Sequence, residues 1–178
     1  ARVTLVGKGV CFDTGGLNLK NEAGMRHMKK DMGGAAIAIG LAHMIIARQV
    51  PVQLRVLIAA VENSIDGMAM RPGDVISTRA GLTVEIGNTD AEGRVVMCEL
   101  LAEADAESPD LLVDVATLTV GARQALGPDV GAYFASRDAT ANAFQQAASE
   151  VSDPVWRLPL HAAYRKRIDS EVADLVNI

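Results

Sequence analysis

The sequence predicts an α/β fold with three layers, α/β/α, around a central sheet that is mixed but mainly parallel. Short apolar runs rich in β-branched residues alternate along the chain with longer runs of helical pattern. One helical run is apolar on most of its faces, which is typical of a helix buried against a sheet. A strand, a helix and a second strand in succession form a right-handed parallel crossover by default. Together these observations place helices on both faces of the sheet.

The first strand is expected at Val3–Val6, and a glycine-dense loop, Gly7–Gly16, follows it. The apolar helix is expected at Met32–Arg48, and Pro51 ends the connection to a β-branched strand at Gln53–Val61. The remaining elements continue the alternation, with strands at Val75–Ser77, Leu82–Ile86, Leu111–Ala116 and Val130–Ala135, and helices at Val95–Ala106, Thr140–Val151 and Tyr164–Ile168.

Length and composition fit one soluble globular domain in the cytoplasm. The chain has 178 residues, of which 49% are hydrophobic and 22% charged, enough for a substantial core. A net charge of −5 makes nucleic acid an unexpected partner. No apolar run approaches the ~18–20 residues needed to span a membrane, and no signal peptide pattern is present. Cys11 and Cys98 have neither metal-site nor disulfide-framework spacing, so both are expected to be reduced thiols.

The segment Asn88–Arg94 lies between an expected strand and an expected helix. It carries three charged residues close together: Asp90, Glu92 and Arg94. If the extended geometry continued into it, Asp90 and Glu92 would point to the same side. Gly93 would allow close backbone approach beside Arg94, and the two carboxylates would suit a hard cation. The alternative is that these acids only cap the following helix. This segment alone leaves both interpretations open.

The glycine-dense loop Gly7–Gly16 invites comparison with a phosphate-binding P-loop. The required Gly-x-x-x-x-Gly-Lys-Ser/Thr order is absent, and Lys8 precedes most of the glycines. Glycines at this density instead allow the backbone to turn tightly around a bound group. Asp31 stands just ahead of the apolar helix, where capping is its simplest role.

Four acidic residues are nevertheless expected to meet at one edge of the sheet, because sites in α/β folds gather at the carboxyl ends of strands. They are Asp13, Asp31, Asp90 and Glu92. Their four charges match two divalent cations, carboxylates suit Mg, Mn or Zn, and paired metals are a common hydrolytic device. There is no His-Glu-x-x-His motif, and the three histidines are too scattered to be expected as ligands.

Five segments resemble the leucyl aminopeptidase (cytosol aminopeptidase) family, in the family's order and at compatible separations. They are Val6–Gly16, Met28–Ala35, Arg71–Asp74, Asn88–Arg94 and Ala116–Thr119. The resemblance covers almost the whole chain, and Asn-Thr-Asp-Ala-Glu-Gly-Arg is highly specific to the family. It implies a zinc-peptidase-like catalytic domain, of which residues 1–178 would form a part. The family's separate N-terminal domain and the C-terminal end of its catalytic domain would then lie outside this chain.

The resemblance also assigns individual positions. It implies metal ligation by Lys8, Asp13, Asp31, Asp90 and Glu92. In the family pattern, Asp13 and Glu92 would bridge two ions. It implies catalytic roles for Lys20 and Arg94, and places Met28 and Thr117 in the wall of the substrate pocket. The implied cofactors are two divalent metal ions, Zn or Mn, with bicarbonate held by the arginine. The implied substrates are peptides with a free N-terminus, with a leucine-like preference, and the family assembles as hexamers.

Two departures from the family pattern bear on specificity more than on chemistry. Asn63–Gly67 reads Asn-Ser-Ile-Asp-Gly where the family usually has Asn-Met-Pro-Ser-Gly, and Val120 intervenes before Gly121. Two other functions remain as alternatives. One is a dinuclear phosphoesterase, and the other is a metal-binding scaffold or binding protein that keeps the fold without peptidase activity.

Overall fold

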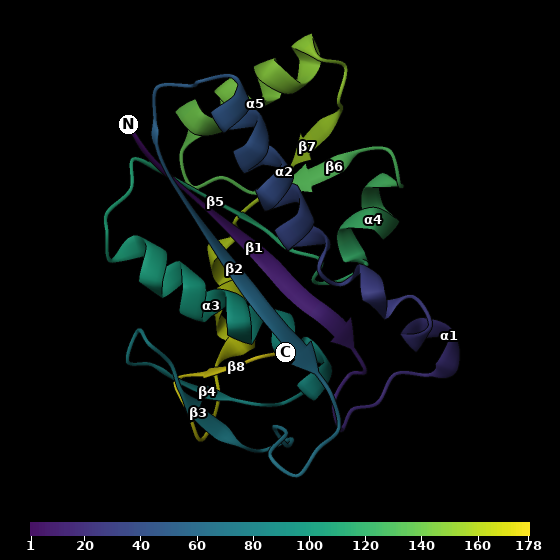
Figure 1. The fold of residues 1–178 in the computed structure, drawn as a ribbon. Helices are drawn as coiled ribbons and strands as arrows, with labels where there is room; N and C mark the ends of the chain where they lie inside the picture. Colours follow the sequence, from purple (N-terminus) through teal and green to yellow (C-terminus); the bar gives the residue numbers. More distant parts are fainter. The chain divides into compact units, whose positions relative to one another are not determined.

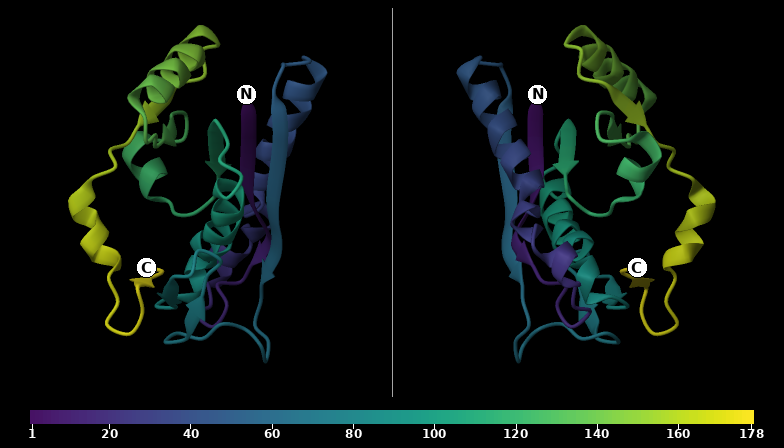
Figure 2. Two further views of the ribbon diagram at one scale, coloured as in Figure 1. Left: turned by 90° about the vertical axis from the view of Figure 1, so that its left-hand side faces the viewer. Right: turned by 90° about the vertical axis from the view of Figure 1, so that its right-hand side faces the viewer.

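The computed structural model describes residues 1–178, and the chain forms two compact units (Figure 1). The first unit comprises Ala1–Leu118 and Ile168–Ile178, and the second comprises Thr119–Arg167. The centre of the first unit is a parallel sheet of strand order β2-β1-β5. Its strands are β1 (Arg2–Asp13), β2 (Gln53–Asn63) and β5 (Leu111–Val115). Figure 2 shows β1 and β2 running side by side along their length.

Helices cover both faces of this sheet, which confirms the three-layer α/β/α fold. Successive side chains of a strand point to opposite faces, so Leu5 and Val6 belong to different hydrophobic clusters. Leu5 packs against α2 (Gly33–Ala47), and Val6 packs against α3 (Glu92–Asp105). The buried helical partners are Ala38 and Ala42 from α2, and Met97 and Ala104 from α3.

Strand β1 is longer than predicted and runs through most of the expected glycine loop as far as Asp13. A Cβ on Gly7 would lie 2.7 Å from the Cα of Ala35, and one on Gly9 would lie 2.8 Å from the carbonyl oxygen of Ala59. These glycines therefore let α2 and β2 approach the central strand closely. The loop prediction was wrong here because a glycine needed for close packing looks the same in sequence as a glycine needed for a turn.

The antiparallel strands of the predicted mixed sheet do not lie in the central sheet. They lie in a second, smaller sheet of strand order β3-β4-β8. Strand β3 (Val75–Ser77) runs antiparallel to β4 (Thr83–Glu85), and β8 (Leu175–Val176) runs parallel to β4. The chain leaves β4 directly into the segment Asn88–Arg94. The small sheet thus fixes the direction from which the chain enters that segment, within the first unit.

Several short helical turns and the second unit complete the chain. The turns of the first unit are α1 (Glu22–Met25), η1 (Met28–Lys30) and η2 (Thr89–Ala91), the last two being 3-10 helices. The second unit contains α4 (Gly121–Leu126), β6 (Gly131–Tyr133), α5 (Asp138–Glu150), β7 (Val155–Arg157) and most of η3 (Ala162–Ile168). Strands β6 and β7 pair in parallel, and Tyr133 packs edge-to-face on Phe144. Helix α4, which begins at Gly121, was not among the predicted elements.

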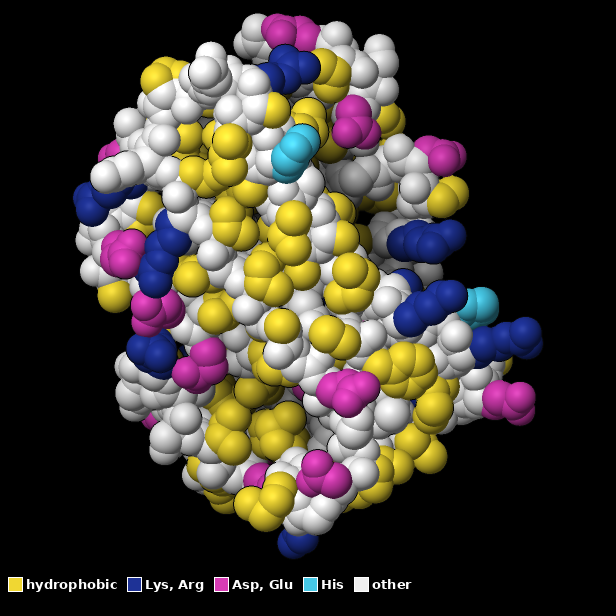
Figure 3. All heavy atoms as spheres, viewed as in Figure 1, with side chains coloured by type: hydrophobic (Ala, Val, Ile, Leu, Met, Phe, Trp, Pro, Cys, Tyr) yellow, Lys and Arg dark blue, Asp and Glu magenta, His cyan; other side chains and the backbone are white.

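The helical stretch Glu22–Ala47 is long and apolar enough, by length and composition alone, to cross a membrane, contrary to the sequence prediction. The charged 3-10 turn Met28–Lys30 interrupts it, and α2 packs against the sheet with its inner face. The core helix of a soluble protein and a signal sequence can both meet the same criteria of length and composition. The outer face of α2 exposes apolar side chains, which Figure 3 shows gathered over this helix: Ile37, Ile39, Leu41, Met44 and Ile46.

Two glycines of α2 provide a matched test of its close contact with the sheet. A Cβ on Gly34 would lie 2.1 Å from the carbonyl oxygen of Val115, whereas one on Gly40 would meet no atom within 4 Å. Gly34→Ala should therefore lower the free energy of unfolding by about 1–3 kcal/mol, because the helix must move off the sheet. Gly40→Ala should leave it unchanged or raise it by up to ~1 kcal/mol. Equal urea midpoints for the two variants of the complete natural protein would contradict this packing.

Candidate functional site

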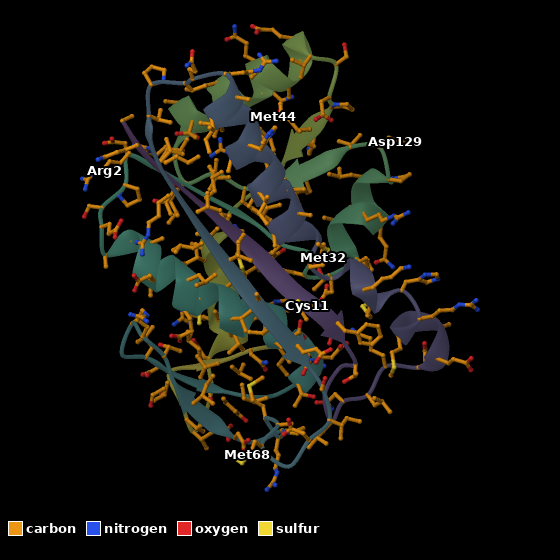
Figure 4. All side chains as sticks on the ribbon, in the orientation of Figure 1. Arg2, Cys11, Met32, Met44, Met68 and Asp129 are labelled. Atoms are coloured by element: carbon orange, nitrogen blue, oxygen red, sulfur yellow. The ribbon has the colours of Figure 1, made fainter.

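The candidate site lies in the first unit, where β1 and β2 end and α3 begins. Asp13 is the last residue of β1, Asp90 lies in η2, and Glu92 opens α3. One carboxylate oxygen from each of these three residues lies within 4.8 Å of the others, so the group could hold a metal ion. Figure 4 shows oxygen-tipped side chains near the arrowhead of β1, close to the labelled Cys11.

The acids of Asn88–Arg94 converge for a different reason from the one predicted. The segment is not extended: η2 makes a 3-10 turn, and Glu92 is already helical. The side-chain oxygen of Asn88 accepts a hydrogen bond of 2.8 Å from the amide of Asp90, so the asparagine caps this turn. Glu92 is 3% exposed and turns its carboxylate into the acidic group. Capping is therefore not the main role of either acid.

Lys8 is buried against two of the carboxylates. Its Nζ lies 2.7 Å from Oδ2 of Asp31 and 3.0 Å from Oε1 of Glu92, and it donates a hydrogen bond of 3.1 Å to the carbonyl of Thr117. A Cβ on Gly93 would lie 2.6 Å from both Cε and Nζ of the lysine. The close backbone approach expected at Gly93 is thus confirmed, and the backbone of α3 leaves just enough room for this amine.

Lys20 pairs with the other two carboxylates. Its Nζ lies 2.9 Å from Oδ2 of Asp13 and also forms a close ion pair with Asp90. Burial disfavours the charge of Lys20, but the hydrogen bonds that it donates to Asp90 and Asp13 outweigh the burial and raise the pKa of the lysine. Burial likewise disfavours the charge of Asp13, yet its hydrogen bonds from Lys20, Gly15 and Asn63 lower the pKa of that carboxyl. At Glu92 burial prevails over Lys8 and raises the pKa.

Two buried oxygens of the site lack a hydrogen bond. They are Oδ2 of Asp31 and Oε1 of Glu92, which have Lys8 Nζ within ion-pair distance but not in hydrogen-bonding geometry. Apart from the ammonium group of Lys8 these two oxygens have no polar partner, so they are available to a metal cation. Carboxylate oxygens together with one amine nitrogen suit divalent ions of the Zn and Mn type. The residues present therefore fit a metal centre.

Asp31 does not cap α2, contrary to its simplest interpretation. The N-cap residue is Met32, which has no capping side-chain bond. The hydroxyl of Thr117 donates instead to Oδ1 of Asp31 at 2.9 Å, which holds that carboxylate towards Lys8. Of the other predicted residues, half-buried Met28 begins η1, and half-buried Arg94 lies in the first turn of α3 without an ion pair to the acidic group.

Sequence reasoning missed the residues that support the acidic segment. Thr89 is buried, and its hydroxyl donates to the carbonyl of Gly15 at 2.6 Å and accepts from the amide of Asn18 at 2.9 Å. This clasp ties the loop that carries Lys20 to the turn that carries Asp90. Nothing in the sequence marks these residues, because 71 positions separate the two partners of the clasp.

Asn177, near the end of the chain, is the second support that was missed. Its Oδ1 accepts from the amides of Gly87 and Asn88 at 2.9 and 3.1 Å, and its Nδ2 donates to the carbonyls of Asn88 and Ala91 at 2.8 and 3.3 Å. The side chain of Asn177 thus accepts from backbone amides and donates to backbone carbonyls of the same turn, as the backbone of a neighbouring strand would do. It therefore fixes the turn from which Asp90 projects.

Comparisons with known proteins agree along the whole chain. Residues 1–178 match the model of the cytosol aminopeptidase family, catalytic domain. A probable cytosol aminopeptidase from Xanthomonas oryzae pv. oryzae (strain MAFF 311018) is 47% identical over 174 residues, covering 98% of this chain and 36% of that protein. One from Chlorobium luteolum is 47% identical over 178 residues, covering 99% of this chain and 35% of that protein. The chain thus spans about a third of the length of these curated relatives.

Solved structures show the same likeness. The crystal structure of a cytosol aminopeptidase from Coxiella burnetii superposes with a TM-score of 0.95 at 59% identity, covering 98% of this chain and 38% of that one. The bottromycin maturation enzyme BotP in complex with Mn superposes with a TM-score of 0.93 at 45% identity, covering 99% of this chain and 40% of that one.

The contacts of Asn177 predict a local effect of its removal. Asn177→Ala would leave the amides of Gly87 and Asn88 without their acceptor, at a cost of about 1–3 kcal/mol. In the complete natural protein, hydrogen exchange should accelerate in the segment 83–92 and stay unchanged in β1. Uniform acceleration, or none, would show that Asn177 does not hold the turn.

Proposed function

Because the chain belongs to the cytosol aminopeptidase family, we propose that its complete protein is a metallo-aminopeptidase that removes the N-terminal residue from peptides. The observation that carries the proposal is the group of four buried or half-buried carboxylates with one buried lysine, which fits a metal centre. Its members are Lys8, Asp13, Asp31, Asp90 and Glu92. We propose these five as the metal ligands, with Asp13 and Glu92 between two ions.

We propose Zn or Mn as the ions, and the Mn complex of BotP supports the second. When bound, two such ions supply a Lewis acid for the scissile carbonyl and a water whose pKa is lowered towards neutrality. The residues of the chain supply the frame. Asp13 and Glu92 approach each other closely enough for their oxygens to share one binding region, and Lys8 adds a nitrogen next to Oε1 of Glu92.

Lys20 is the proposed electrostatic catalyst. It is already charged among carboxylates, and its side chain is 15% exposed, against 3% for Lys8, so it can face a substrate. An ammonium group there would stabilise the negative charge that develops on the carbonyl oxygen. Arg94, in the first turn of α3, would hold bicarbonate as the group that moves a proton. A guanidinium beside a helix N-terminus favours such an anion.

The proposals for substrate selection and assembly rest on the resemblance to the family. Met28 and Thr117 are proposed to line the pocket for the N-terminal side chain, with a leucine-like preference. Peptides with a free N-terminus are the proposed substrates, the cytoplasm is the proposed location, in keeping with the names of the relatives, and the complete protein is proposed to form hexamers.

The direct test is hydrolysis by the complete natural protein after chelation and after addition of Mn or Zn. Leucyl p-nitroanilide should be cleaved only with metal, and p-nitrophenyl phosphate should not be cleaved. Phosphate-ester cleavage without anilide cleavage would make the protein a phosphoesterase. Metal binding without either activity would make it a binding protein, and both outcomes would overturn the proposal.

Two substitutions should separate metal binding from catalysis. Lys20→Met should keep two metals per chain and lower kcat by about 10²–10³-fold, as expected when a donor to a developing oxyanion is lost. Asp90→Ala should lose metal as well as turnover while keeping the fold, because the side chain of Asp90 is one-third exposed. Metal content is measured by elemental analysis of dialysed protein. A change confined to KM in Lys20→Met would place the lysine in ground-state binding instead.

A further inference from the structure

The end of β1 contains an irregularity that places Asp13 opposite Asn63. Along the parallel pair, Val10 faces Val61, yet the next registered pair is Asp13 with Asn63. Three steps along β1 therefore match two steps along β2, so β1 carries one extra residue. In an uninterrupted register Phe12 would face Asn63. A bulge next to a functional site commonly redirects a side chain in this way.

The amide of Asn63 lies between the carboxylates that this bulge brings together. Its Nδ2 is 2.8 Å from Oδ1 of Asp13, 3.0 Å from the carbonyl oxygen of Thr89 and 3.3 Å from Oε2 of Glu92. The residue is 8% exposed. One neutral NH₂ group, whose two N–H donors are shared among these three oxygens, thus bridges the ends of β1 and β2 to the start of α3.

These bonds determine which carboxylate oxygens remain free. Oδ1 of Asp13 accepts from Asn63 and from the amide of Gly15 at 2.9 Å, so both of its lone pairs are used. Its other oxygen faces Lys20. Oε2 of Glu92 faces Asn63, whereas Oε1 has no hydrogen bond and faces Lys8. Each carboxylate is held through one oxygen and offers the other to a cation.

We propose that Asn63 is a positioning residue of the metal centre, whose amide holds Asp13 and Glu92 so that one oxygen of each faces the cation. The inference rests on the proposed function, because it assumes a metal between these carboxylates. A neutral donor suits this positioning role, because it holds two negatively charged carboxylates close together without neutralising the charge that attracts the cation. A lysine or arginine there would compete.

The first test is the affinity of the complete natural protein for Mn²⁺, measured by competition with a fluorescent chelator. Asn63→Ala should weaken affinity by about 10–100-fold, the usual effect of removing a group that orients a metal ligand. Asn63→Ser keeps a hydrogen-bond donor, but its side chain is too short to span the three acceptors, so it should show the same loss of affinity. This variant replaces Asn63→Ala in the test if Asn63→Ala does not fold. Asn142→Ala, at an exposed asparagine of α5, is the matched control and should not change affinity.

A double-mutant cycle distinguishes positioning from a general structural role. In an Asp13→Ala background the main partner of the amide is gone, so Asn63→Ala should weaken Mn²⁺ affinity by less than about threefold. The weak-binding variants are followed by the electron paramagnetic resonance of free Mn²⁺. Additive losses would mean that Asn63 acts through the fold and would overturn the inference, as would Asn63→Ala with wild-type affinity. If the wild type binds neither Mn nor Zn, the proposed function itself fails.

Discussion

The site depends on the burial of carboxylates that cannot stay buried alone. Moving an unpaired carboxylate out of water is expensive, and the structure meets that cost with two lysines that divide the acids between them. Lys8 faces Asp31 and Glu92, and Lys20 faces Asp13 and Asp90. Four negative and two positive charges leave the group with a deficit of positive charge. Divalent cations are the natural complement of that deficit, which grows further if Lys8 binds a metal as a neutral amine.

Bringing these groups together constrains the backbone more than the side chains. Lys8 reaches Glu92 only because Gly93 has no Cβ, and α2 reaches the sheet only because Gly34 has none. Gly15 and Gly16 both have positive φ, so the loop after β1 can turn back towards Thr89. The glycines thus serve packing along β1 and turning beyond it. Both uses converge on the same edge of the sheet.

Much of the fold could be predicted from the sequence, because local patterns of apolar residues determine most of the helices and strands. The alternation of apolar runs indicated the strands and the two covering helices, and the acidic residues fall where parallel strands end. What could not be predicted depends on contacts distant in sequence. The bulge before Asp13 is visible only against β2, and the support of the Asn88 turn comes from Asn177, 89 residues away. The convergence of Asp90 and Glu92 was expected for the wrong reason, since a 3-10 turn, and not a strand, brings them together.

The groups that hold the carboxylates in place are neutral hydrogen-bond donors, whereas the carboxylates themselves are charged. Asp13 is held on one oxygen by an amide side chain and a backbone amide, and Asp31 is held by the hydroxyl of Thr117. These neutral donors leave the carboxylate charge uncompensated. The lysines face the remaining oxygens of these two carboxylates. A cation can therefore bind the oxygens that face the lysines while the neutral bonds keep each carboxylate in place. A frame built from salt bridges alone would have to break in order to bind the ion.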